Sequence, residues 1–131
     1  MIPLFRAWWP EEKRYYDVGC IDWRNGDMRV LTHRGYAQEL MSPSTVLELF
    51  TGVVDTSVER RKIFDGDLIQ PTTASYRIVK VVRFVPDRAA FMMANQEDIE
   101  KDLLDPWQPL SQRWVDECRA VVIGNIHGVP L

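Results

Sequence analysis

The chain has 131 residues, of which 46% are hydrophobic, 27% are charged and 11% are aromatic. This length suits one domain, or one domain with a small lobe, and the composition excludes the disordered and fibrous classes of protein. The formal net charge of -3 excludes a protein built around one large basic surface, although a local basic patch is compatible with it.

The cysteines and the hydropathy pattern exclude further classes. Cys20 and Cys118 have no CxxC or histidine-paired spacing, so we expect buried reduced thiols rather than a zinc or redox site. The chain contains no stretch of about twenty apolar residues and opens with no leader-like pattern. We therefore expect no membrane contact and a cytoplasmic location.

The first third of the sequence predicts a β-meander with aromatic cross-strand pairs. Pro10 and the acidic residues after it are typical of a turn, and Asn25-Gly26 is typical of a two-residue hairpin because both positions tolerate positive φ. The three strands that these turns separate are residues 3–9, 15–23 and 28–32.

The middle of the chain predicts a boundary. Ser42-Pro43 is typical of a helix start, but the apolar run after it is short, so we expect a single helical turn. Residues 46–51 favour a strand, because they include β-branched types and Gly52 follows them. The polar segment at residues 51–62 is turn-like and separates two subdomains. These are an N-terminal β-rich subdomain, 1–58, and a C-terminal subdomain, 59–131, in one compact unit.

The most regular strand in the sequence covers residues 76–85. Its residues are mostly β-branched or aromatic, with Arg77, Lys80 and Arg83 between them. Because alternate residues of a strand face opposite sides, Arg77 and Arg83 share one face and Lys80 lies on the other. Three further elements follow: a hairpin partner at residues 89–94, a short helix that Asn95 caps and that runs through Leu104, and a final strand at residues 119–127. The fold class is thus mainly β (α+β), with one or two short helices.

Three segments stand out in order: PLFRAWW at the start, FTGVVDTSVERRKIFDGDLI in the centre, and VVIGNIHGVPL at the end. Together they resemble the YopX-like family of phage and prophage proteins, in which an FRAW-type strand, a YTG element, an (I/V)(Y/F)-x-GD(I/L) element and VIGNIY-x-NP-x-L follow one another. His127 and Val129 depart from that ending. The resemblance implies a phage or prophage origin and an SH3-like small barrel in the C-terminal part. It implies no activity.

The titratable residues give no catalytic pattern. Asp65 and Asp67 flank Gly66, and two close carboxylates can bind a cation or share a proton, but a turn entering a strand explains them without either. Neither His33 nor His127 lies beside a nucleophile motif. We therefore expect no catalytic residue, no metal, no cofactor and no enzymatic activity.

Gly124-Asn125 has no phosphate-loop context and is typical of a bulge in the last strand. Glycine would allow the bend, and asparagine would bind local backbone groups. If Gly124 has positive φ, its replacement by Val destabilises the fold.

The aromatic content and the lack of catalytic motifs favour a non-enzymatic module that binds another protein, from phage or host, or assembles with itself. The alternative is a nucleic-acid-binding module that uses the SH3-like barrel, with Arg77, Lys80 and Arg83 as its basic face. Binding at the first strand is opposed by the nearby acidic residues Glu11, Glu12 and Asp17. Trp8 and Trp9 lie on opposite faces of that strand, so one of them belongs to the core. The candidate binding surface is Arg6, Trp8, Trp9, Arg77 and Arg83.

The strand at residues 76–85 also predicts self-association. It is apolar on much of both faces, and an unpaired edge there would be covered by a second copy of the chain in a homo-oligomer. The competing interpretation is that a segment of the same chain folds back over this surface and gives a monomer. That segment contains Ile99, Leu103, Leu104 and Trp107.

Overall fold

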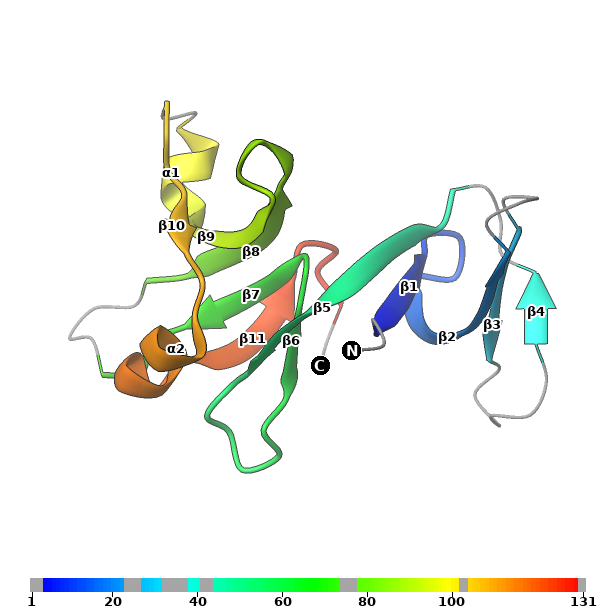
Figure 1. Cartoon of the computed structure of the whole chain (residues 1–131), viewed down its shortest axis with the longest axis horizontal. Helices are drawn as coiled ribbons and strands as arrows, with labels where there is room; N and C mark the ends of the chain where they lie inside the picture. The colour runs from blue at the N-terminus through cyan, green and yellow to red at the C-terminus, as the bar shows by residue number, and fades with distance from the viewer. Residues whose placement is uncertain are drawn as a thin grey trace. The chain divides into compact units, whose positions relative to one another are not determined.

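The computed structural model describes residues 4–22, 27–31, 38–40, 44–73, 78–101 and 104–129. It confirms a mainly β fold and divides the chain into two compact units, Met1–Phe50 and Thr51–Leu131 (Figure 1). The boundary predicted after residue 58 stays a prediction, and these units divide inside a strand, between Phe50 and Thr51. The reason is that residues directly after Phe50 already bond within the second unit: the Thr51 hydroxyl donates to the Ile63 carbonyl at 2.7 Å.

The first unit is the predicted meander. Its strands are β1 (Phe5–Trp9), β2 (Arg14–Asp22), β3 (Asp27–Leu31), β4 (Gln38–Leu40) and the start of β5 (Val46–Val54). They lie in the order β4-β3-β2-β1-β5-β6, where β6 (Lys62–Phe64) belongs to the second unit. Trp8 faces Tyr15 across β1 and β2, with ring centroids 5.1 Å apart, so the predicted aromatic cross-strand pairing is confirmed.

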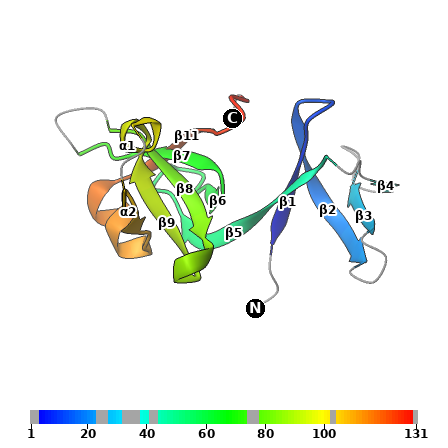
Figure 2. The ribbon, with the colours of Figure 1, turned by 90° about the horizontal axis from the view of Figure 1, so that it is seen from above.

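The second unit is built on a five-stranded sheet in the order β10-β9-β8-β7-β11. Figure 2 shows β8 and β9 as a hairpin. The elements of this unit after β6 are β7 (Asp67–Gln70), β8 (Lys80–Val85), η1 (Pro86–Arg88), β9 (Ala90–Asn95), α1 (Gln96–Glu100), β10 (Gln108–Pro109), α2 (Gln112–Cys118) and β11 (Val121–Asn125). Closure of this unit into an SH3-like barrel stays a prediction.

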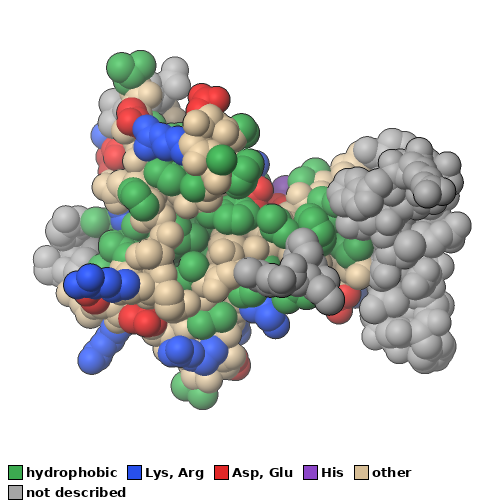
Figure 3. All heavy atoms as spheres, in the orientation of Figure 1, with side chains coloured by type: hydrophobic (Ala, Val, Ile, Leu, Met, Phe, Trp, Pro, Cys, Tyr) green, Lys and Arg blue, Asp and Glu red, His purple; other side chains and the backbone are tan. Residues whose placement is uncertain are grey.

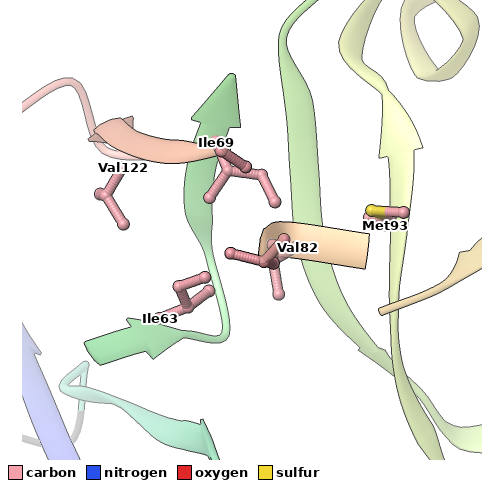
Figure 4. Packing of buried hydrophobic residues seen from close by; sticks show 7 residues of the cluster. Ile63, Ile69, Val82, Met93 and Val122 are labelled. Carbon is pink, nitrogen blue, oxygen red and sulfur yellow. The ribbon is translucent and has the colours of Figure 1, made fainter. Parts of the chain in front are cut away.

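One face of the five-stranded sheet carries the core of the second unit. Ile69, Val82 and Met93 come from three neighbouring strands, and Ile63 from β6 lies against them (Figure 4). Val115 of α2 is fully buried in the same cluster. Burying a Val side chain contributes about 1.5–3 kcal/mol, and the Gln112 side chain also bonds to the backbone of Val54, so both residues hold α2 in place.

Helix α2 is absent from the elements that the sequence predicted. It begins where the Ser111 hydroxyl accepts a hydrogen bond from the Trp114 amide at 3.1 Å, and it ends at Arg119, which has φ of 50°. Serine is a preferred N-cap because its oxygen binds an amide that the first turn leaves free. Ser111, as a preferred N-cap residue, was the sequence signal from which this helix could have been predicted.

The strand predicted at residues 76–85 begins later than expected. It starts at Lys80, whose partner Asn95 is the last residue of β9, so pairing with β9 limits the strand. Residues 74–77, including Arg77, lie outside the described residues. The predicted helix starts at the expected place but ends at Glu100, and the Asn95 side chain accepts from Lys80 instead of capping it. The hairpin at Asn25-Gly26, the helix start at Ser42-Pro43, and His33 also fall outside the described residues.

The edges of the five-stranded sheet differ from those expected. Strand β8 is central, between β7 and β9, so it leaves no edge for a second copy. At the β11 edge, the Val122 amide donates to Asp55 Oδ2 at 3.0 Å and the Thr56 amide donates to the Ala120 carbonyl at 3.0 Å. The opposite edge, β10, has two residues, one of them Pro109, which has no amide hydrogen to offer. Within the described residues, no helix is long and apolar enough to cross a membrane.

Candidate functional site

A groove lies on the sheet face opposite the core of the second unit. Val82 points into the core, so strand alternation turns Val81 and Arg83 to the other face. Leu68 is the register partner of Val81 and lies on that face with it. The groove has a volume of about 400 Å³. Its lining residues are Leu68, Val81, Arg83, Gln96, Ile99, Glu100, Trp107 and Ile126.

Five of the eight residues that line the groove are apolar. Ile99 and Ile126 are large hydrophobic residues that are 37% and 44% exposed. Ile99 and Trp107 belong to the segment that was expected to fold back over the sheet, and both line the groove. Leu104 of the same segment is fully exposed, and Leu103 lies outside the described residues. On the face of the second unit shown in Figure 3, hydrophobic side chains gather over β7 and β8, and charged side chains of both signs lie around α1.

Polar groups of the groove differ in whether they already have partners. The guanidinium of Arg83 lies 3.4 Å from Asp65 Oδ1, so its charge is largely balanced. Among the described residues, by contrast, the side chains of Gln96, Glu100 and Trp107 have no hydrogen-bond or ion-pair partner. The groove therefore offers an amide, a carboxylate and an indole N–H to a bound molecule.

Helix α1 gives this side of the groove a negative charge. Lys101 donates to Glu97 Oε1 at 2.8 Å, and this hydrogen bond lowers the pKa of Glu97 and raises that of Lys101. The acidic residues Asp98 and Glu100 remain in the same short helix. Because one lysine balances one of three carboxylates, α1 is acidic overall.

Lys80 is buried on the core face, as the alternation predicts. Its ammonium donates to Asn95 Oδ1 at 2.7 Å and to Gln108 Oε1 at 3.0 Å, and it lies 5.8 Å from the ring centroid of Trp114. Burial lowers the pKa of Lys80, and the charge of Asp98 opposes this in part. Lys80 ties β8 to β9 and β10, and it contributes nothing to an exposed basic face.

The first strand places its predicted surface residues largely inside the first unit. Trp8 is 7% exposed, which removes it from an exposed surface. Arg6 Nε donates to Glu48 Oε1 at 2.8 Å, and its guanidinium lies 4.1 Å from the centroid of the Tyr15 ring. Trp9 is half-buried on the opposite face, against the cluster around Ala7. Arg6 and Trp8 are therefore bound within the fold. Among the described members of the expected surface, which exclude Arg77, Arg83 is the one that lines the groove.

The Asp65-Gly66-Asp67 turn is held by its own hydrogen bonds. Asp67 is buried and accepts from the Phe64 amide at 2.8 Å, while Asp65 accepts from the Phe84 amide at 3.2 Å. Gly66 has φ of 91°, a conformation that favours glycine, and its amide donates to the Val82 carbonyl at 2.7 Å. Asp67 thus binds within the turn, whereas Asp65 binds β8, through the Phe84 amide and the Arg83 guanidinium.

The end of β11 contains the expected bulge. The pairing of β11 with β7 shifts register between Val122 and Gly124, and Asn125 Oδ1 accepts from the amides of His127 and Val129. Gly124, however, does not have positive φ, and a Cβ there would meet only Leu68 Cδ1, at 3.9 Å. The bend therefore does not depend on a glycine-only conformation.

Comparison with known proteins supports one family. The family model described as YopX protein matches residues 4–131. The crystal structure of protein EF1440 from Enterococcus faecalis is similar in fold, with a TM-score of 0.61 and 21% sequence identity over 98% of this chain and 95% of that one. No curated protein matches the sequence significantly.

Proposed function

The chain belongs to the YopX family, and we propose that it is a non-enzymatic interaction protein that holds a segment of another protein in the groove of its second unit. The proposal includes a phage or prophage origin and a phage or host protein as the partner in the bacterial cytoplasm. The resemblance of its three ordered motifs to phage and prophage proteins supports that origin.

The observation that carries the proposal is the groove itself. Its lining combines five apolar residues with an amide, a carboxylate and an indole N–H that have no partner among the described residues. Apolar surface rimmed by polar groups is typical of sites that bind proteins or other ligands. The residues that line it come from β7, β8, α1 and the segments after α1 and β11, so the fold of the second unit is enough to form it.

A different protein suits the structure better than a second copy of the chain. The expectation of a homo-oligomer was based on an unpaired edge at residues 76–85, but β8 is central in its sheet. At one edge the Val122 amide of β11 donates to Asp55, and the Ala120 carbonyl just before β11 accepts from Thr56. At the other edge Pro109 of β10 has no amide hydrogen to offer. Pairing of a second copy at these edges would therefore satisfy fewer backbone groups and stabilise a homo-oligomer less.

The nucleic-acid alternative has less support among the described residues. Lys80 is buried, Arg83 pairs with Asp65, and Arg6 pairs with Glu48. A phosphate backbone needs cations that are free to replace its counterions, and each of these three already has a partner in the protein.

The test is a pair of charge substitutions at two exposed apolar residues. Ile99→Glu places a carboxylate in the groove, whereas Leu104→Glu places one at a fully exposed position outside its lining. The full chain and both variants are immobilised and used to capture proteins from a lysate of the bacterial host, which are identified by mass spectrometry. We expect the wild type and Leu104→Glu to retain the same protein and Ile99→Glu to lose it.

Circular dichroism and thermal melting show whether both variants remain folded. If folded Ile99→Glu captures the same protein as the wild type, the groove is not the binding site.

A further inference from the structure

We infer that the occupant of the groove is an extended peptide segment that places one apolar side chain on the groove floor and a lysine or arginine next to it. The inference depends on the proposed function and specifies the chemistry of the partner.

The size of the groove favours a short anchor. Its volume of about 400 Å³ lies toward the lower end of the range of about 300–1,000 Å³ that is typical of sites for single small ligands. An amphipathic helix binds through anchors spread over two turns, which needs a longer groove. An extended segment needs room for one apolar side chain at a time, because the side chains next to it point away from the groove floor, where a long cationic side chain can still reach the rim. Leu68, Val81 and Ile99 supply the apolar contact for that side chain.

The free polar groups fit a peptide backbone. Gln96 has both a donor and an acceptor in its amide, which is the pair of functions that one peptide unit presents in return. Trp107 adds an indole N–H that can donate to a carbonyl. Neither side chain has a hydrogen-bond partner among the described residues, so binding a peptide costs no existing side-chain bond of theirs.

The charged side chains around the groove determine which residue type is favoured next to the apolar anchor of the peptide. Arg83 is balanced by Asp65 at 3.4 Å, and Glu97 is balanced by Lys101 at 2.8 Å. The carboxylate of Glu100 lines the groove and has no ion pair in the described part of the chain. The unbalanced charge at the rim is therefore negative. A cationic residue beside the anchor is attracted by this negative charge, and an acidic residue is repelled by it.

Two fluorescent peptide pools test the inference by anisotropy with the full chain. Both pools have leucine at the central position and uncharged residues elsewhere, but the position after leucine is lysine in one and glutamate in the other. We expect the lysine pool to bind about two- to fivefold more tightly, the range that an exposed ion pair supplies. The preference should shrink as salt is added.

Glu100→Gln should bring the two pools to equal affinity while both still bind. The matched control is Glu117→Gln on α2, which removes an exposed carboxylate outside the groove lining and should leave the preference intact.

Equal affinity of the wild type for both pools, or tighter binding of the glutamate pool, overturns the choice of a basic neighbour. Whether the groove is a binding site is then decided separately by the capture experiment, in which Ile99→Glu should lose the protein that the wild type retains. Absence of binding by either pool overturns the inference of a short peptide, and the capture experiment decides separately whether the groove binds a protein.

Discussion

Asp55 shows how one buried residue can stabilise a sheet edge. It is fully buried, and its Oδ1 accepts from the Ser57 amide and hydroxyl and from the Arg61 amide, while its Oδ2 accepts from Val122 of β11. Burial by itself would raise the pKa of Asp55. The hydrogen bonds from Ser57, Val122 and Arg61 outweigh that effect and hold the pKa below its ordinary value.

A lowered pKa makes stability depend on pH in a defined direction. The contribution of Asp55 is complete above its unfolded-state pKa of about 3.9 and is lost as the pH falls through the lower folded-state value. Asp55→Asn keeps one acceptor oxygen but places an amide donor where Val122 donates, so we expect a loss of about 1–3 kcal/mol at pH 7. Urea unfolding should show the difference between wild type and variant shrinking below about pH 4.

Glu59→Gln is the control, because Glu59 is exposed and has only a 3.9 Å contact with Arg61. A difference between wild type and Asp55→Asn that stays constant from pH 7 to the acid limit of folding would contradict the role assigned to the carboxylate.

At the scale of single elements, local patterns predicted the strands better than their ends. The meander and the β8–β9 hairpin follow from turn residues and β-branched runs close in sequence. The start of β8 at Lys80 depends on where β9 ends, which is a pairing between segments that composition does not reveal. The alternation that places Lys80 and Arg83 on opposite faces could be predicted from the sequence. The two partners of Lys80 could not, because Asn95 and Gln108 lie too far along the chain.

The groove could be predicted only in part. Ile99 and Trp107 were recognised as part of a segment that could cover the sheet, since they are apolar residues in a polar stretch. Their meeting with Leu68 and Ile126 depends on the order of strands in the sheet. Trp8 was assigned to a surface because an aromatic residue in a strand looks the same whether a neighbouring strand covers it or not.

Two glycines in the second unit should respond differently to the same substitution. Gly66 has φ of 91°, so Gly66→Ala strains the turn and should cost about 1 kcal/mol or more. Gly124→Ala adds a methyl group at ordinary contact distance from Leu68, without positive φ, and should change stability by less than about 0.5 kcal/mol. Melting temperatures of the two variants test this, and a larger loss for Gly124→Ala would contradict the assignment of the bulge.

At the scale of the whole molecule, the chain is a family member with two units, and only one of them has a described groove. The family model matches residues 4–131, and the likeness to the Enterococcus faecalis structure covers 98% of the chain, so both extend over the two units. In the described part of the first unit, Trp8 packs on Tyr15, Trp9 packs on Tyr16, and Arg6 lies over the Tyr15 ring. The second unit is therefore where we place the contact with a partner.

The most direct test of that placement is the set of indole N–H signals in a nitrogen-15 spectrum. Trp107 lines the groove, whereas Trp8 is buried in the first unit and Trp114 packs against the core of the second. Trp107→Phe assigns its signal, and the leucine–lysine peptide pool is then added to the labelled full chain. We predict that the Trp107 signal shifts while those of Trp8 and Trp114 stay in place. Movement of the Trp8 signal with no change at Trp107 would contradict the account.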